Sequence, residues 1–465
     1  MIEIQASGRR SRRDFLRIGA AGFSSLTLAD LLRAESSAGI HGSRKSIINI
    51  HLDGGPPQMD MIDLKPNSPA EVRGEFKPIS TALSGFQICE LMPKTASIAN
   101  DFAFIRSLVG AASKHDAFQC QSGFSDDQLK SIGGRPAMGC VLTHLLASAT
   151  DDAPCFVDLM QGRPLVRNSA RPGFLGPIAR PFRPDISKTF PRVLEDGMKI
   201  ELQRQGANHR TELTLNAKLN AVRLRSRSTL LEGLDQLRRE VDATGMMDAM
   251  DRFHQQAAGI LLSGRFAEAM DLSKAEPRML DHYTAPASGH LNSASYTSEN
   301  EYSMRKFLLA RRLIEAGVRC VSVSFSDFDT HANNYPRLRH LLPVLDHGLW
   351  ALMTDLKQRG MLDDVSIVVW GEFGRTPTIN AQGGRDHWPK VGMAMLAGGG
   401  MKVGQVIGAT DRLASAATER PVSYQDVFAT LYRNLGIDAF KTTIEDPTGR
   451  PQYLLSEGSA ISELA

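Results

Sequence analysis

Short apolar runs alternate along this chain with longer segments in which apolar residues recur at helical spacing. The runs that predict β-strands cover residues 47–52, 102–109, 155–159, 320–325, 365–370 and 393–397. The helical pattern is clearest in residues 137–147, 338–359 and 422–435. Because strands that alternate with helices are typical of βαβ units, this pattern predicts an α/β fold built on a mainly parallel sheet.

Several residues mark the ends of the predicted helices. Gly317 and Gly360 each follow a helical segment, where glycine favours the left-handed conformation that ends a helix. Ser423 stands before the last helical segment as a candidate N-cap. A further helix is expected to begin near His115, after the predicted strand 102–109.

The middle of the chain differs from the rest. Residues 160–190 are rich in Pro, Gly and Arg and predict a long surface loop. From about residue 205 to 275 the pattern is mainly helical, with leucines such as Leu230, Leu234 and Leu237 on one face and charges on the other. Two interpretations stay open for this insertion: helices that pack on the main sheet, or a coiled coil that binds a partner.

The N-terminal segment predicts export. Arg12-Arg13-Asp14-Phe15-Leu16 precedes a moderately apolar stretch, an order typical of a bacterial twin-arginine signal. The stretch is too short and too polar for a stable membrane span. An ordinary basic amphipathic helix is the alternative. We therefore expect residues 1–38 to be a signal read by the twin-arginine export machinery, and the mature protein to be periplasmic or secreted.

Composition and charge exclude some classes of function. The formal net charge is +3, and residues 1–38, with six Arg against four Asp and Glu, account for +2 of it. The remainder is therefore about neutral, which gives no electrostatic case for nucleic acid binding. The five cysteines are widely spaced and form no C-x-x-C motif, so neither a zinc finger nor a disulfide framework is indicated.

Carboxylates follow three of the predicted strands. Asp53 stands after residues 47–52, Asp327 and Asp329 after residues 320–325, and Glu372 after residues 365–370. Because the carboxyl ends of parallel strands converge on one edge of a sheet, these acids and nearby histidines could surround a divalent cation. Taken alone, Asp53-Gly54 would be a turn signal.

Asp327, Asp329 and His331 offer oxygen and nitrogen ligands within five residues. Asp329 and His331 lie on the same side if the segment is extended, which favours them over Asp327. The alternative is an Asx-turn that caps the next helix. Asp386 and His387 form a second acid–imidazole pair, in which His387 is a candidate ligand and Asp386 a ligand or its orienting partner. A buried structural histidine is the other interpretation.

Candidate catalytic residues stand beside these ligands. Glu372 could bind metal or act as a base, and Arg375 could clamp an anionic substrate; alternatively, the two form a pair that orders their loop. Ser113 is a candidate nucleophile and His115 a candidate base or ligand, both just after the strand 102–109. The role of His51, within the first strand, is open.

Several motifs together resemble the DUF1501 family of exported bacterial proteins. Beside the twin-arginine leader they are Leu52-Asp53-Gly54-Gly55-Pro56, Gly173-Phe174-Leu175-Gly176, Asp329-Thr330-His331-x-Asn333-Asn334, Gly371-Glu372-Phe373-Gly374-Arg375-Thr376-Pro377 and Gly384-Arg385-Asp386-His387-Trp388-Pro389. The resemblance covers about residues 45–440. The family is grouped with the alkaline phosphatase-like superfamily, which includes phosphatases, sulfatases and phosphoglycerate mutases.

This resemblance implies one doubly wound α/β domain over residues 45–440, with metal at the strand ends and a C-terminal tail at 441–465. In the superfamily pattern Asp53 would be the first-strand ligand, Asp327 or Asp329 with His331 the second set, and His387 the last ligand. The chain departs from that pattern in two ways. Glu372-Phe373 replaces an Asp-His pair, which could reduce a two-metal site to one, and the sulfatase nucleophile motif is absent.

The function expected from these observations is that of an exported, metal-dependent hydrolase of sulfate or phosphate esters. Its cofactor would be a divalent ion, either zinc, calcium, magnesium or manganese, and its substrate a small-molecule or glycan ester. The alternative is a catalytically degenerate member of the family that binds an anionic glycan or a protein partner.

Overall fold

The computed structural model describes residues 45–125, 127–128, 132–148, 151–161, 170–191, 264–287 and 296–465. The expected signal at residues 1–38 and most of the expected helical insertion at 205–275 lie outside the described residues.

The centre of the described part is an eight-stranded sheet in the order β11-β4-β10-β7-β1-β6-β5, with β14 paired to β4. Its longer strands are β1 (Ser46–Leu52), β4 (Phe102–Val109), β5 (Phe156–Leu159), β6 (Cys320–Phe325), β7 (Val365–Trp370) and β10 (Gly392–Gly398). The short edge strands are β11 (Gln405–Ile407) and β14 (Val422–Ser423). The predicted strands and the mainly parallel sheet are thus confirmed.

Within this eight-stranded sheet of the described residues, β10 runs against the direction of the other seven strands. β5, β6, β1 and β7 pair in parallel, β10 is antiparallel to both β7 and β4, and β11 and β14 are parallel to β4. It follows that β4 has the same direction as β1, β6 and β7. The carboxyl ends of these strands therefore lie at one edge of the sheet.

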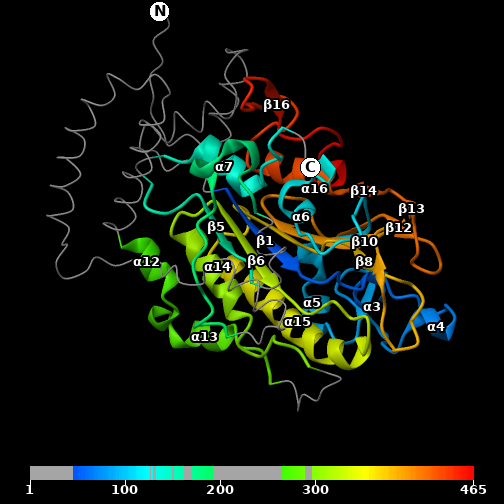
Figure 1. The fold of residues 1–465 in the computed structure, drawn as a ribbon. Coiled ribbons are helices and arrows are strands. Elements are labelled where there is room, and N and C mark those ends of the chain that lie inside the picture. Colours follow the sequence, from blue (N-terminus) through cyan, green and yellow to red (C-terminus); the bar gives the residue numbers. More distant parts are fainter. Residues whose placement is uncertain are drawn as a thin grey trace, which may run out of the picture. The chain divides into compact units, whose positions relative to one another are not determined.

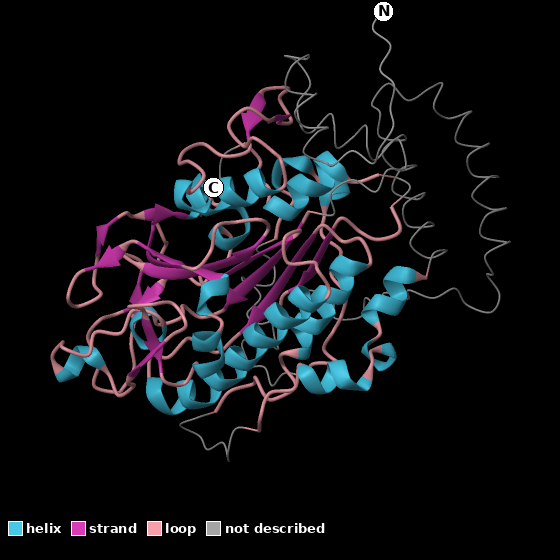
Figure 2. Cartoon of the chain, turned by 180° about the vertical axis from the view of Figure 1, so that it is seen from behind, coloured by secondary structure: helices cyan, strands magenta, loops and turns pink. Residues whose placement is uncertain are grey.

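Helices cover both faces of the sheet, as Figures 1 and 2 show. One face packs against α14 (Arg305–Glu315) and α15 (Asn334–Gln358), and the other against α7 (Met138–Leu146) and α16 (Tyr424–Asn434). Side chains alternate between the faces along β1, so Ile48 and Ile50 join the first core and Ile47 joins the second. Two cores, one on each side of a buried sheet, make this a layered α/β fold.

The helix ends agree with the sequence signals. Ser423 and Asp426 form a capping box at the start of α16. Gly317 and Gly360 follow α14 and α15 with φ of 110° and 65°, the left-handed conformation expected of residues that end helices. The helix expected near His115 is an exception: the chain there is a turn, and the next helix, α6 (Gln119–Ser122), begins later and is short.

The remaining elements are short. The helices are α3 (Gln58–Met61), α4 (Ala70–Arg73), α5 (Pro93–Ser97), α12 (Arg265–Met270) and α13 (Pro277–His282), and the two-stranded sheets are β2 (Pro78–Ser80) with β3 (Gln87–Cys89), β8 (Gly374–Arg375) with β9 (His387–Trp388), β12 (Ala409–Thr410) with β13 (Ala417–Glu419), and β15 (Thr443–Glu445) with β16 (Pro451–Tyr453).

Residues 441–465, expected to be a tail beyond the domain, belong to the same compact unit as the sheet, Arg44–Ala465. Leu455, Ile461 and Leu464 are buried in the core that also contains α16. Among the described helices, none combines the length and apolar character that a membrane span needs.

Candidate metal centre

Two groups of possible metal ligands lie at the carboxyl edge of the sheet. The inner group, His51, Asp53 and Glu372, is buried, whereas the outer group, His115, Asp329 and His387, is partly exposed. Within each group, one candidate ligand atom from each residue lies within 4.8 Å of the others. The residues come from β1, from β9 and from the segments that follow β1, β4, β6 and β7, so the topology of the sheet brings distant parts of the chain together.

Glu372 is the centre of the inner group. One carboxylate oxygen, Oε1, accepts a hydrogen bond from the Gly54 amide at 3.0 Å, and the other, Oε2, lies 3.3 Å from Nε2 of His51. Both side chains are fully buried. Burial alone would raise the pKa of Glu372, but the hydrogen bond with His115 and the ionic contact with His51 outweigh it and hold this pKa well below its usual range. Glu372 is therefore a carboxylate anion inside the protein.

His115 connects the two groups. Its Nδ1 lies 2.9 Å from Glu372 Oε1, and its Nε2 lies 3.2 Å from Asp329 Oδ2. Desolvation would lower the pKa of this imidazole, but the hydrogen bonds to Asp329 and Glu372 outweigh that effect and raise the pKa to about 9. His115 therefore lies between two carboxylates and contacts both groups.

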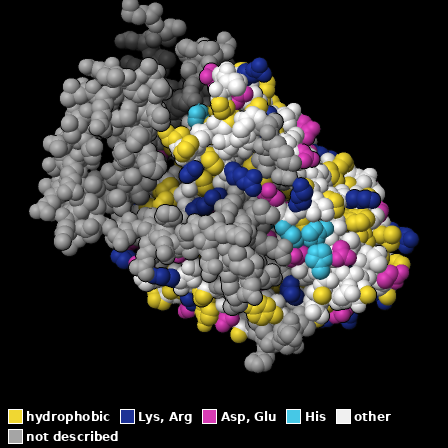
Figure 3. Space-filling model, in the orientation of Figure 1, with side chains coloured by type: hydrophobic (Ala, Val, Ile, Leu, Met, Phe, Trp, Pro, Cys, Tyr) yellow, Lys and Arg dark blue, Asp and Glu magenta, His cyan; other side chains and the backbone are white. Residues whose placement is uncertain are grey.

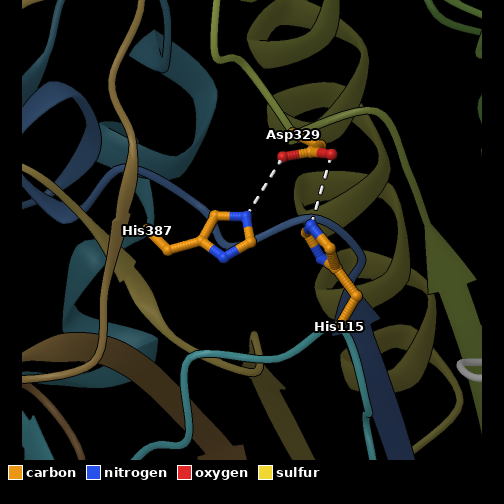
Figure 4. Close-up of side chains that lie close together, drawn as sticks. All are labelled: His115, Asp329 and His387. Atoms are coloured by element: carbon orange, nitrogen blue, oxygen red, sulfur yellow. Dashed lines mark ion pairs between the residues drawn. The ribbon is translucent and has the colours of Figure 1, made fainter.

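Asp329 is the centre of the outer group (Figure 4). Its Oδ1 lies 3.5 Å from His387 Nε2 and accepts a hydrogen bond from Arg375 Nη2 at 2.6 Å. Burial would raise the pKa of Asp329, but the ionic contacts with His115 and His387 and the hydrogen bond from Arg375 hold it well below its usual range. His387 Nδ1 donates to the Ser113 carbonyl oxygen at 3.3 Å, which leaves Nε2 as the nitrogen that can bind a cation.

Arg375 does not have the geometry expected of an anion clamp. Its side chain is fully buried, and it donates to the carbonyl oxygens of Gly54, Gly55 and Arg385 as well as to Asp329. All of these acceptors belong to the protein. Arg375 therefore positions Asp329 and the loop after β1, and the sequence-based expectation that it would grip a substrate is not supported.

His331 and Asp386 form a pair at the rim of the site. His331 Nδ1 lies 2.5 Å from Asp386 Oδ1, and its Nε2 lies 3.2 Å from Asp329 Oδ1. Both side chains are about half exposed, and neither residue falls within the inner or outer group. Figure 3 shows histidine side chains gathered at the surface with acidic side chains nearby.

Asp327 belongs to neither group, and Ser113 contacts the outer group through its backbone. Asp327 has a positive φ of 74°, and its carboxylate accepts hydrogen bonds from the hydroxyl of Thr297 and from the amide and hydroxyl of Ser298. It thereby holds the segment 297–298 rather than joining Asp329. Ser113 is exposed, and its carbonyl oxygen, rather than its hydroxyl, contacts His387.

His51 is the candidate ligand whose role the sequence left open. Side chains alternate along a strand, so His51 and Asp53 project toward the same side, and this spacing was the available signal. Nothing in the sequence near β1 shows, however, that Glu372 would lie against the imidazole.

The donor set fits a divalent cation. Both ring nitrogens of His51, Oε2 of Glu372 and Nε2 of His387 are buried without a hydrogen-bond partner among the described residues. Buried polar atoms normally form hydrogen bonds, so a cluster of such atoms without hydrogen bonds indicates that another group binds there. A cation bound by imidazole nitrogens and carboxylate oxygens would satisfy them.

The fold and the site together define an α/β protein with a candidate divalent-cation centre at the carboxyl edge of its sheet. The chain belongs to the family described as "Protein of unknown function (DUF1501)", whose model matches residues 44–465. No curated protein matches the chain.

Solved structures with some similarity include Ps i-CgsB and its complex with k-i-k-neocarrahexaose. Each is 10% identical, with 84% of this chain and 72% of that chain covered, and the TM-scores are 0.38 and 0.37. PsFucS1 sulfatase from Pseudoalteromonas sp. is 13% identical, with 88% and 71% covered and a TM-score of 0.35.

Proposed function

We propose that this protein is an exported, metal-dependent hydrolase of sulfate or phosphate esters, with an alkaline phosphatase-like arrangement of its site. The observation that carries the proposal is the meeting of the inner and outer groups at the carboxyl edge, with buried imidazole and carboxylate atoms left without hydrogen bonds. Buried polar atoms are normally satisfied, so several of them at one sheet edge, on residues that bind metals, support a bound cation.

The inner and outer groups would each hold a cation. His51, Asp53 and Glu372 would hold a cation in the buried position, and His115, Asp329 and His387 would hold one in the partly exposed position. The mixture of imidazole and carboxylate favours a transition metal such as zinc or manganese over calcium or magnesium. When bound, the cation supplies Lewis-acid polarisation of a phosphoryl or sulfuryl oxygen.

The chain's own groups would bind and orient the ester. The rim pair, His331 and Asp386, is exposed to solvent beside Asp329, so a substrate approaching the outer group meets it first. Asp386 orients the His331 imidazole, which can then exchange a proton with the leaving group. A small-molecule or glycan ester would suit a site that opens at the surface.

A second candidate function is binding without turnover, in which the protein retains a cation and recognises an anionic glycan or a protein partner. The observation that favours it concerns the nucleophile. Cys120 is fully buried, and the Ser122 hydroxyl donates to the Phe118 carbonyl oxygen. These two side chains, which lie shortly after Ser113 in the chain, are therefore not open to an ester, whereas Ser113 is exposed.

Export through the twin-arginine pathway is part of the proposal. The N-terminal motif supports it, and transport in the folded state would let the protein acquire its cation before it crosses the membrane.

Turnover of a panel of aryl sulfate and aryl phosphate esters, with and without a chelator, tests the proposed activity. We expect hydrolysis of at least one ester class that the chelator abolishes and that Asp329→Ala combined with His387→Ala removes. Asp363→Ala is the matched control, because Asp363 is exposed at the opposite end of β7. Bound metal without turnover on any ester would overturn the hydrolase assignment in favour of binding.

A further inference from the structure

A buried aspartate outside both ligand groups connects the loops that carry the outer ligands. Asp60 lies on the short helix α3, seven residues after Asp53 in sequence, and its side chain is 1% exposed. Its carboxylate accepts hydrogen bonds from Arg385 Nε and Nη2 at 2.8 and 3.0 Å and from Asn334 Nδ2 at 2.9 Å. One buried acid thus contacts two separate loops.

Through Arg385, Asp60 holds the loop that carries Asp386 and His387. The Arg385 guanidinium is fully buried, and it also donates to the carbonyl oxygens of Thr376, Pro377 and Val72. Arg385 directly precedes Asp386 and His387 in the chain. The hydrogen bonds that fix its guanidinium therefore also restrict where these two side chains can lie.

Through Asn334, Asp60 holds the loop that carries Asp329 and His331. The Asn334 side-chain oxygen accepts a hydrogen bond from the Thr330 hydroxyl at 2.6 Å. Thr330 lies between Asp329 and His331, so this bond fixes the backbone from which both side chains project.

The two loops also bond to each other directly. The Arg385 amide donates to the Thr330 carbonyl oxygen at 2.9 Å, and the amides of Asn333 and Asn334 donate to the carbonyl oxygens of Gln382 and Gly383 at 3.2 and 3.0 Å. The Asp60 carboxylate supports this contact from both sides, because it accepts from Arg385 in one loop and from Asn334 at the start of α15, where the other loop ends.

We propose that Asp60 is a positioning residue for the metal centre, which sets the relative placement of Asp329 and His387 without touching the cation. The inference rests on the proposed function in assigning those two residues as ligands. It predicts that loss of the Asp60 charge separates the loops and weakens metal binding on the order of 10-fold, the lower end of the loss seen when a direct partner of a ligand is removed, because Asp60 acts through Arg385 and Asn334.

The test compares Asp60→Asn with the matched control Asp355→Asn. Asp355 is likewise buried, at 2% exposed, and accepts from two arginines and a tyrosine, Arg311, Arg359 and Tyr283, at 2.8, 2.7 and 2.9 Å. It lies about 30 Å from Asn334 along α15. Both substitutions leave buried arginine donors without a carboxylate, so both are expected to lower the unfolding midpoint.

Two measurements separate a positioning role from a structural one. Hydrogen exchange, measured after a chelator has removed metal, gives the protection of the amides of Asn333, Asn334 and Arg385. Titration with zinc gives the affinity for the metal. We expect faster exchange at these amides and weaker zinc binding in Asp60→Asn only. Wild-type exchange rates at these amides in Asp60→Asn, or equal loss of zinc affinity in Asp355→Asn, would overturn the inference. If the wild-type protein bound no metal, the proposed function would fail, while the exchange of these amides would still decide whether Asp60 holds the two loops.

Discussion

At the residue scale, the segments that follow β1 and β6 can approach each other because Gly54 has no side chain. Gly54 has a φ of +112°, and a Cβ built on it would lie 2.3 Å from the amide nitrogen of Asp329. The same residue donates its amide hydrogen to Glu372 and accepts at its carbonyl from Arg375. Gly54 therefore allows the segment after β6 to reach the inner group.

Gly54→Ala should disrupt both the fold and the site. We expect a loss of about 3 kcal/mol in the free energy of unfolding, because the new methyl group meets backbone atoms and the conformation is strained for a non-glycine residue. Gly360→Ala is the control, since Gly360 also has a positive φ, +65°, but open space around its Cβ position; its cost should be about 1 kcal/mol. Urea unfolding of both variants measures the difference, and equal losses would contradict the close contact at Gly54.

The sequence could nominate acids and histidines at strand ends but not their partners. Asp327 and Asp329 have the same chemistry and stand two residues apart, yet the left-handed backbone at Asp327 turns its carboxylate to Ser298, about 30 residues away in the chain. Arg375 was expected to clamp a substrate. The residues next to it in sequence do not reveal that its guanidinium donates to the carbonyl oxygens of Gly54 and Gly55. The roles of Asp327 and Arg375 depend on contacts between segments that are distant in sequence. A local sequence pattern does not reveal such contacts.

At the scale of elements, local sequence signals correctly predicted where several helices begin or end. The capping box of Ser423 and the left-handed Gly317 and Gly360 follow from backbone chemistry that acts over a few residues. The segment around His115 is different, because Asp116 accepts from the Phe118 amide and the chain turns before α6 starts. That turn leaves the imidazole free to reach Glu372 and Asp329, which a helix beginning at His115 would not guarantee.

The C-terminal segment gives a prediction at this scale. Arg420 donates to both carboxylate oxygens of Glu463, at 2.7 and 3.1 Å, and this interaction lowers the pKa of Glu463 from 4.5 to about 2. Because the pKa is lower in the folded protein, the stabilisation is fully present above pH 4.5 and is lost as the pH falls through about 2. The side chains are about one third exposed, so the effect should stay below about 1 kcal/mol.

Glu463→Gln should therefore lower the unfolding midpoint slightly at pH 7 and have no effect near pH 2. Glu419→Gln serves as the control, since Glu419 is an exposed acid beside the same arginine in sequence. Thermal unfolding across this pH range measures the difference from wild type. A difference for Glu463→Gln that persisted unchanged down to pH 2 would contradict the assignment of the stabilisation to the ionised carboxylate.

At the scale of the whole molecule, the order and direction of the strands create the site. The sequence predicted the strands and a mainly parallel sheet, but it contained no signal for the reversed direction of β10 or for the place of β4 beyond it. Because β10 is antiparallel to both neighbours, β4 has the direction of β7 and brings His115 to the same edge as Glu372. Strand direction depends on packing across the entire sheet, which is why the convergence could be expected only in outline.

The metal content of the purified mature protein tests the central claim most directly. Elemental analysis after exposure to zinc, manganese, calcium and magnesium, followed by removal of loosely bound ions, should find at least one equivalent of a divalent metal per chain. The combination of Asp329→Ala with His387→Ala should remove metal, whereas Asp363→Ala should leave the content unchanged. A folded wild-type protein without stoichiometric metal, or an unchanged content in the double variant, would contradict the account.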